Sequence, residues 1–291
     1  RQFKDFLAAV RAEEGCIEYF PAVDIDAAKV QQLRHQFDQA GLYGRRISIH
    51  THNPIAFQAP PYIANLVVVG SSFATPNMTL DNLRTIYNSV RPYGGALWLA
   101  IPETDKPRLL DFVAEATLPT ARIDDQGEGI MIFREGSLPD TDDWTHQYGN
   151  IANTVKSNDR RVKLPLGVLW FGGSSNMDVL PRHGHGPPEQ VIGGRTFVEG
   201  VDSLSARDTY TGRVLWKRTI ENLGNFGVYY DGSYQDTPLS TKYNQVHIPG
   251  ANGRGTNYVA TDKEVYVVTG SKCQVLDAGT GATVREIQMP P

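Results

Sequence analysis

A short repeated phrase near the C-terminal end constrains the fold of this chain more than any other feature. Residues 206–216 read Ala-x-Asp-x-x-Thr-Gly-x-x-x-Trp, and residues 275–285 repeat the Asp and the Thr-Gly at the same spacing. Each copy predicts a strand, a tight turn and a second strand, because Asp and Thr-Gly favour turns between strands. Hairpins that recur along a chain are typical of stacked blades or of a solenoid.

The spacing of the tryptophans indicates the blades of a β-propeller. Trp170 and Trp216 each end a Val-Leu-Trp phrase and lie 46 residues apart, close to the roughly 40–50 residues of a propeller blade. The next interval ends at Arg285, which takes the tryptophan position, and is lengthened by a Gly-, Asn- and Tyr-rich insertion at 222–257. Closing a propeller takes roughly four to eight blades, and we expect about two and a half here. We therefore expect an incomplete propeller in a fragment of a longer protein.

The chain divides into two parts with different patterns. Residues 1–135 alternate strand-like and helix-like segments, which predicts an α/β domain with a doubly wound sheet. Residues 136–143 form a polar linker. Residues 144–291 hold short apolar runs broken by Gly, Pro and Asn, which predicts an all-β domain. Strands are expected there at Val168–Phe171, Gln190–Ile192, Thr196–Glu199, Val214–Lys217, Tyr258–Ala260, Val265–Thr269 and Gln274–Leu276.

Composition excludes several classes of protein. The net charge of −4, with mixed signs, argues against a nucleic-acid partner, and no apolar run approaches the roughly 18 residues of a membrane span. The two cysteines, Cys16 and Cys273, predict neither a disulfide framework nor a metal cluster. The sequence starts without Met, and a signal peptide upstream of Arg1 would place the protein in the periplasm or otherwise outside the cytoplasm.

Two polar residues stand where a doubly wound sheet binds ligands, at the carboxyl ends of its strands. Asp24 follows the first predicted strand, where a carboxylate can accept hydrogen bonds from both hydroxyls of a ribose. Alternatively, Asp24 is a strand-end or helix-capping residue, although Asp26 suits the cap better. Asn53 follows the strand at 46–50, where its amide can read an adenine edge, or else it forms a turn with Pro54.

Roughly residues 1–134 resemble the class I S-adenosylmethionine-dependent methyltransferases. The matches are Val23-Asp24-Ile25-Asp26, Gly41-Leu42-Tyr43-Gly44, Asn53-Pro54, Ala64-Asn65-Leu66-Val67-Val68, and the phrase from Leu83 to Arg91-Pro92-Tyr93-Gly94-Gly95. The resemblance implies that S-adenosylmethionine binds the full-length protein, with Asp24 on its ribose and Asn53 beside its adenine. The family's first strand and glycine-rich loop would precede Arg1, so we expect a sheet without its first strand and no tight cofactor binding by this chain. Tyr93 departs from the family, which has Pro-Gly-Gly at this point.

The tryptophan phrase resembles the motif of pyrroloquinoline-quinone-type β-propellers, and residues 143–150 with Asn153 and Thr154 resemble their entry segment. The resemblance implies that Thr-Gly turns between outer strands and that Trp216 packs between blades. The whole chain resembles large two-domain proteins of planctomycete-type bacteria. Such propellers serve as quinone dehydrogenases and as protein-binding scaffolds, and the motif does not by itself imply the quinone.

One loop of the β half has the residues of a metal site. His183 and His185 are separated by a single glycine, and two imidazoles so placed can bind one metal ion. The third ligand would be His146, His247 or Glu189. Alternatively, the loop is a rigid Gly/Pro turn whose histidines hydrogen-bond backbone groups or line the propeller channel.

Other loops suggest contacts with a ligand. Arg254 lies in a Gly/Asn-rich loop, where it can face an anionic ligand or cap backbone carbonyls. Tyrosines in the insertion suit a surface that contacts sugars or peptides, or they are ordinary exposed loop residues. They are Tyr229, Tyr230, Tyr234 and Tyr243.

Three functions follow from these patterns. The first is a binding or scaffold protein, whose propeller face takes a protein or carbohydrate ligand and whose α/β domain is an accessory or vestigial S-adenosylmethionine-binding fold. The alternative is a methyltransferase whose propeller recruits the substrate. A second alternative is a quinone- or metal-dependent oxidoreductase centred on His183 and His185. Whether the chain is an enzyme stays open at this level.

Overall fold

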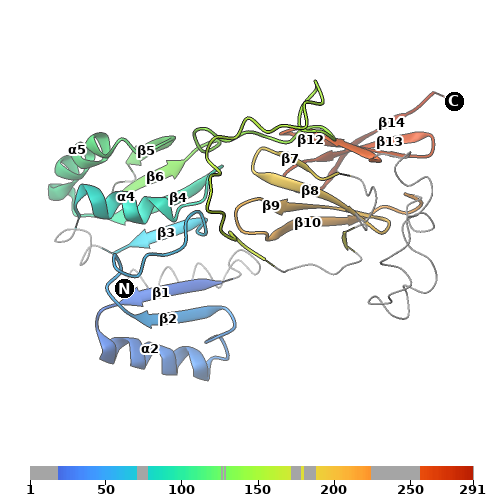
Figure 1. The fold of residues 1–291 in the computed structure, drawn as a ribbon. Coiled ribbons are helices and arrows are strands. Elements are labelled where there is room, and N and C mark those ends of the chain that lie inside the picture. The colour runs from blue at the N-terminus through green and yellow to red at the C-terminus, as the bar shows by residue number, and fades with distance from the viewer. Residues whose placement is uncertain are drawn as a thin grey trace.

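Helices and strands alternate in the first part of the chain, and the described elements of the second part are strands (Figure 1). The computed structural model describes residues 19–70, 78–125, 127, 129–171, 178–179, 188–223 and 256–290. Within these ranges, no helix combines the length and apolar character that a membrane crossing requires. We call residues 19–134 the α/β part, residues 190–290 the β part, and residues 135–189 the connecting segment.

A small parallel sheet lies at the start of the α/β part. β1 (Phe20–Asp24) pairs with β2 (Ile47–Thr51), and α2 (Ala27–Gln39) connects the two strands. The side chain of Asp26 accepts hydrogen bonds from two backbone N–H groups in the first turn of α2, which confirms the predicted cap. Val30, on the face of α2 that packs against the strands, is fully buried.

A mixed four-stranded sheet forms the rest of the α/β part. Its elements are β3 (Leu66–Val69), α4 (Leu80–Asn88), β4 (Gly95–Ala100), η1 (Glu103–Asp105), α5 (Lys106–Ala116), β5 (Ala121–Asp125) and β6 (Gly129–Arg134). The strand order is β3-β4-β6-β5. β3 and β4 are parallel, whereas β6 is antiparallel to both of its neighbours. β5 and β6 are joined by a connection of a few residues, and such a short connection allows only antiparallel pairing.

The prediction of a doubly wound sheet is confirmed only in its alternation of strands and helices. The described strands form two sheets rather than one, and no ladder joins β1 to β3 among the described residues. On β3, Leu66 and Val68 are each 45% exposed. Sequence patterns show which segments are strands, but the pairing between sheets depends on long-range contacts, so periodicity did not reveal this division.

The described strands of the β part form two four-stranded antiparallel sheets, which we call blades, and in each the strands follow chain order. The first blade contains β7 (Gln190–Ile192), β8 (Arg195–Gly200), β9 (Ser203–Asp208) and β10 (Val214–Thr219). The second contains β11 (Tyr258–Ala260), β12 (Glu264–Thr269), β13 (Lys272–Asp277) and β14 (Thr283–Gln288). The two copies of the repeated phrase form the turns β9–β10 and β13–β14, as the sequence predicts.

A tryptophan of the first blade packs against the second blade. Trp216 on β10 is only 7% exposed, and its indole Nε1 donates a hydrogen bond to the carbonyl of Ala278 at 3.0 Å. Its ring lies against Gly281, where a Cβ atom would come within 2.7 Å of the ring. Gly281 also has a φ of +70°, which favours glycine. The expected packing of Trp216 between blades is therefore confirmed.

Trp170 makes the same contacts one repeat earlier. Its Nε1 donates to the carbonyl of Thr209 at 2.9 Å, and its ring covers Gly212, which has a φ of +71°. The strand predicted at Val168–Phe171 is nevertheless absent from the described residues, and Phe171 is 92% exposed. An apolar run becomes a strand only when another strand pairs with it, and no described strand pairs with this one.

Replacing Trp216 by Ala tests the contact between the blades. The change removes a buried ring and its hydrogen bond, so we expect the free energy of unfolding to fall by about 3–5 kcal/mol. Urea unfolding followed by circular dichroism measures the loss. Val284→Ala, at a 53% exposed position of β14, is the control and should change stability by no more than about 0.5 kcal/mol. Equal losses in the two variants would contradict the assigned role of Trp216.

Arg285, which takes the tryptophan position in the second repeat, forms an ion pair instead. Its Nη1 and Nη2 donate to the two carboxylate oxygens of Glu264 at 2.5 and 3.0 Å. The hydroxyl of Tyr266 donates to the same carboxylate at 2.6 Å. The Arg285 hydrogen bonds and then the Tyr266 hydrogen bond lower the pKa of Glu264 to about 2.

This ion pair predicts a pH dependence. The pKa of Glu264 is about 2 in the folded chain and near 4.5 in the unfolded chain, so its contribution is complete above the unfolded value. The stabilisation is lost as the pH falls through about 4 toward 2. We expect the melting temperature of wild type to exceed that of Glu264→Gln at pH 6 and the difference to vanish near pH 2. A difference that does not change with pH would show that the charge contributes nothing.

Candidate functional site

Asp24 ends β1 at the edge where a ligand is predicted. One carboxylate oxygen accepts a hydrogen bond from the backbone N–H of Asp26 at 3.0 Å, and the other forms an ion pair with Lys29. Partial burial acts to raise the pKa of Asp24, but the hydrogen bonds of Lys29 and Asp26 and the charge of Lys29 hold it below its usual value. Asp24 is therefore ionised at neutral pH and already has protein partners.

Asn53 stabilises a turn. Its side-chain oxygen accepts hydrogen bonds from the backbone N–H groups of Ile55 at 2.9 Å and Ala56 at 3.2 Å. This is the geometry of an Asx turn, the alternative that the Asn-Pro sequence offered. The backbone N–H of His52 donates to the carbonyl of Asp24 at 3.0 Å, so the loops that carry Asp24 and Asn53 lie side by side.

Three aromatic side chains beside these loops were not predicted to contribute. The rings of His50 and Phe57 have centroids 5.2 Å apart, and His52 meets Phe57 edge to face at 6.1 Å. They gather at this edge because His50 and His52 flank the last residue of β2 and the next turn brings Phe57 back. Histidine–aromatic contacts leave little signal in a single sequence.

The predicted metal site lies outside the described residues, because His183 and His185 both fall in the segment 180–187. Of the proposed third ligands, His247 is likewise outside, Glu189 is half-buried, and His146 is exposed with its Nδ1 2.8 Å from the hydroxyl of Thr145. Within the described ranges, no group of three or more His, Cys, Asp or Glu side chains is placed to hold a metal. Arg254 and the tyrosines of the insertion also lie outside these ranges.

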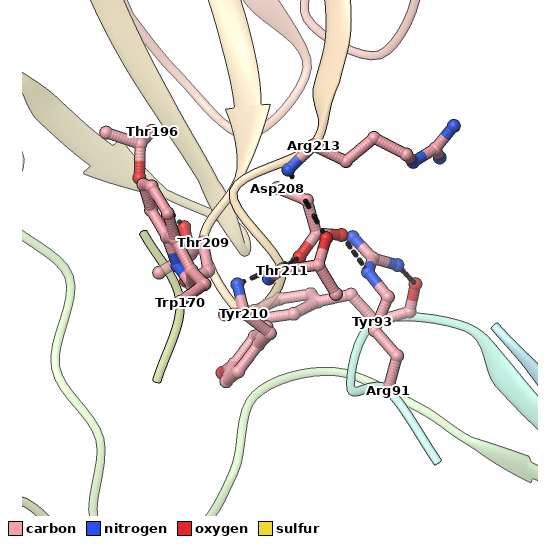
Figure 2. A network of polar contacts seen from close by, with 9 residues as sticks. All are labelled: Arg91, Tyr93, Trp170, Thr196, Asp208, Thr209, Tyr210, Thr211 and Arg213. Carbon is pink, nitrogen blue, oxygen red and sulfur yellow. Dashed lines mark hydrogen bonds and ion pairs between the residues drawn. The ribbon is translucent and has the colours of Figure 1, made fainter. Parts of the chain in front are cut away.

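A buried ion pair joins the α/β part to the β part. Arg91, between α4 and β4, donates from Nε to a carboxylate oxygen of Asp208 in the β9–β10 turn (Figure 2). The Asp208 side chain is 2% exposed and that of Arg91 is 14% exposed. The other Asp208 oxygen accepts hydrogen bonds from the backbone N–H groups of Tyr210 at 2.8 Å and Thr211 at 3.0 Å. One carboxylate therefore holds both the repeat turn and the neighbouring part of the chain.

Tyr93 strengthens the same junction. Its ring covers Gly194, between β7 and β8, so closely that a Cβ atom at Gly194 would overlap the ring. Gly194 has a φ of +73°, and its carbonyl accepts a hydrogen bond from the backbone N–H of Thr209 at 3.1 Å. The backbone carbonyl of Tyr93 accepts a hydrogen bond from Arg91 at 3.1 Å, so the two contact residues support each other.

A pair of tyrosines also meets across the junction. The rings of Tyr62 and Tyr210 pack edge to face, with centroids 5.6 Å apart and an interplanar angle of 67°. Arg161 of the connecting segment donates to the Tyr62 hydroxyl at 2.6 Å. The guanidinium of Arg134 lies 5.2 Å from the centroid of the Tyr62 ring. Residues from all three segments of the chain therefore meet around one aromatic ring.

A cleft of about 680 Å³ opens along this junction. Tyrosines from both parts line it, acidic side chains come mainly from the stretch 140–143, and basic side chains come from the stretch 160–163. The polar and aromatic lining residues are Tyr62, Tyr93, Asp140, Thr141, Asp142, Asp143, Asp159, Arg160, Arg161, Lys163, Thr209 and Tyr210. We call this space the junction cleft. A surface with both charges and exposed rings can hold a ligand that offers apolar faces as well as donors and acceptors.

Burial raises the pKa of three ionisable groups that line the cleft, Tyr93, Asp143 and Tyr210. It raises the pKa of Asp143, and the negative charge of Asp142 adds to this rise, while a 3.4 Å hydrogen bond from the backbone N–H of Gly193 opposes it. Burial also raises the pKa of Tyr210 to about 12. Tyr210 therefore keeps its proton at neutral pH and presents a neutral hydroxyl that can donate and accept.

The sequence interpretation missed this site, although it singled out several of its residues. It quoted Arg91 and Tyr93 as part of a family match and noted that Tyr93 departs from the methyltransferase pattern; both lie in the turn between α4 and β4. The unusual tyrosine at position 93 was the feature of the sequence that could have indicated its contact with Gly194. Residues 136–143 read as a polar linker, but Leu138 within them is 2% exposed and Asp143 lines the junction cleft.

No protein-family model matches the chain, and a search of curated proteins finds no match. Similar solved structures include a candidate S-adenosyl-L-methionine-dependent methyltransferase from Methanococcus maripaludis, with 16% identity, a TM-score of 0.34, and coverage of 40% of this chain and 65% of that one. They also include a quinohemoprotein alcohol dehydrogenase from Comamonas testosteroni, with 19% identity, a TM-score of 0.32, and coverage of 50% and 19%. BamB from Moraxella catarrhalis has 17% identity, a TM-score of 0.22, and coverage of 35% and 24%. This chain thus spans less than two thirds of each of these proteins.

Replacing Asp208 by Asn tests the junction. The variant keeps the oxygen that holds the repeat turn and removes the charge that pairs with Arg91. Breaking a buried ion pair from one side costs about 3–5 kcal/mol, and we expect urea unfolding to show a loss of that size. Asp277→Asn is the matched control, because Asp277 accepts the same turn hydrogen bonds but forms no ion pair among the described residues. Equal losses in the two variants would refute a stabilising role for the Arg91 contact.

Proposed function

We propose that this chain is a binding or scaffold protein whose ligand occupies the junction cleft, with the α/β part acting as an accessory that forms one wall. The observation that carries the proposal is the Arg91–Asp208 ion pair. It uses a carboxylate of the repeat turn to fix the α/β part against the first blade. Both walls of the cleft are thereby held in place before a ligand arrives, which lowers the entropic cost of binding.

The lining of the cleft supports a peptide or carbohydrate ligand. Its volume of about 680 Å³ falls within the roughly 300–1,000 Å³ that small-ligand sites occupy. Tyr93 and Tyr210 offer aromatic surface, and Arg160 and Asp140 offer opposite charges on the same cleft. A ligand with strong charge of one sign would be repelled by part of this lining, whereas a neutral or mixed-charge ligand finds donors and acceptors.

The predicted cofactor residues also fit an accessory role. The side chains of Asp24 and Asn53 form local hydrogen bonds that explain their presence without a cofactor. A ribose at Asp24 would compete with Lys29 for the carboxylate.

The methyltransferase alternative retains one observation in its favour. Asp24 lies at the carboxyl end of β1 in register with Thr51 of β2, and the ring of Phe57 is nearby on the loop after β2. In this alternative Asp24 holds the ribose and Asn53 lies beside the adenine of S-adenosylmethionine, whose bound sulfonium would supply the methyl group. The oxidoreductase alternative rests on His183 and His185 and stays a prediction from the sequence.

Calorimetric titration with S-adenosylmethionine separates the two functions. We expect no heat of binding from wild type, because Lys29 and Asp26 occupy the Asp24 carboxylate and Asn53 is held in its turn. Asp24→Ala and Lys29→Ala are the comparison variants. Saturable binding that Asp24→Ala abolishes would overturn the accessory role and favour the methyltransferase.

Glycan and peptide arrays, followed by titration of the best neutral oligosaccharide or peptide, test the cleft. We expect Tyr210→Phe and Arg160→Ala to weaken binding about tenfold or more, since one good hydrogen bond is worth about 1.4 kcal/mol. Arg122→Ala, on the edge strand β5 and half exposed, is the control and should leave affinity unchanged. Binding that the cleft variants do not weaken would refute the junction cleft as the ligand site.

A further inference from the structure

Among the residues that the structure describes, a buried arginine on the first blade has two donor atoms without a hydrogen-bond partner. Arg207, the residue before Asp208 on β9, is only 7% exposed. It stands in register with Thr196 on β8 and Val214 on β10. Its Nε and Nη2 atoms are buried and have no hydrogen-bond partner among the described residues. A buried donor left unsatisfied costs about 1–3 kcal/mol, and more when it is charged.

The second copy of the repeat shows that the fold does not need an arginine here. Leu276 occupies the same place, one residue before Asp277, and is fully buried in the apolar core between the blades. The strands and turns around the two positions are alike. Arg207 is therefore a departure from the repeat, which points to a requirement other than the blade itself.

The charges around Arg207 do not balance within the described residues. Lys217 stands on β10, in register with Ser205, which is two residues before Arg207 on β9 and faces the same side of the sheet. The carboxylate of Asp178 forms an ion pair with Lys217. Burial lowers the pKa of Arg207, and the Asp178 charge acts to raise it. Within the described part of the chain, Arg207 and Lys217 thus share the carboxylate of Asp178, and one positive charge has no counter-charge there.

The two unpartnered atoms define the kind of group that would fit. Nε–H and one Nη2–H lie on the same edge of the planar guanidinium and point in parallel, which is the fork that grips two oxygens of a carboxylate or phosphate. We propose that Arg207 is the centre of an oxyanion-binding site on this face of the first blade, with Lys217 as a second cation beside it. The site lies apart from the junction cleft, whose lining does not include Arg207 or Lys217.

Thermal unfolding at constant ionic strength tests this site. Sodium phosphate or sodium acetate replaces part of a sodium chloride background, and the two anions distinguish a phosphate ligand from a carboxylate ligand. We expect one of them to raise the melting temperature of wild type in a saturable way, as a ligand that binds only the folded state must. Arg207→Leu, which introduces the residue of the second repeat, should lose the shift entirely. Arg207→Lys should weaken the affinity at least tenfold, because an ammonium lacks the fork.

The control is Arg218→Leu on β10, which removes a charge from the opposite face, where Arg218 donates to the carbonyl of Gly281 at 3.2 Å. It should leave the anion-dependent shift unchanged, whatever it does to stability. A wild-type melting temperature that neither anion raises more than it raises that of Arg207→Leu would overturn the proposal. If Arg207→Leu then proves less stable than wild type, a carboxylate of the chain itself fills the fork; if it proves more stable, Arg207 is simply an unpaired buried charge.

Discussion

The arrangement of this protein depends on the carboxylate of Asp208. In the repeat, such an aspartate accepts backbone hydrogen bonds that close the tight turn between two strands, as Asp277 does in the second blade. At Asp208 one oxygen does this work and the other pairs with Arg91 of the α/β part (Figure 2). Because the pair is nearly excluded from water, solvent screens its attraction only weakly. Removing either partner would leave the other charge buried without compensation and would destabilise the fold. Asp208 is therefore both a turn residue of the repeat and the residue that connects the β part to the α/β part.

The aromatic contacts at this junction resemble the tryptophan–glycine contacts between successive repeats. The tryptophan that ends one repeat covers the turn glycine of the next, at Trp216 on Gly281 and at Trp170 on Gly212. Tyr93 of the α/β part covers Gly194 of the first blade by the same physical means, an aromatic ring on a residue without a Cβ atom. The junction cleft is a consequence, since the two parts meet at Arg91, Tyr93 and Tyr62 and leave space beside these contacts.

Much of the fold could be predicted because its signals are local. The Asp and Thr-Gly spacing gave both hairpins, the short apolar runs gave β7, β8, β10, β11, β12 and β13, and Asp26 was identified as a cap. The prediction of a strand at Val168–Phe171 was wrong for the described residues, because a strand also needs a neighbouring strand to pair with, and no local sequence pattern indicates one. The single doubly wound sheet failed for the same reason, since ladder formation between β1 and β3 is a long-range property. Asp24 lies at the end of β1, as expected, and Asn53 forms the turn that the sequence offered as its alternative role, but the Lys29 ion pair of Asp24 was not foreseen.

The sequence by itself determined the two architectures, the turns of the repeat and the residues that close them, because these depend on hydrogen bonds and periodicities within a few positions. Only the tertiary structure decided how the parts meet. Arg91 and Asp208 are 117 positions apart, and nothing local to either residue specifies the other. The same holds for Arg207, which reads as an ordinary variable position of the motif. Its meaning comes from burial, from the Lys217–Asp178 pair beside it and from the leucine that replaces it in the next blade.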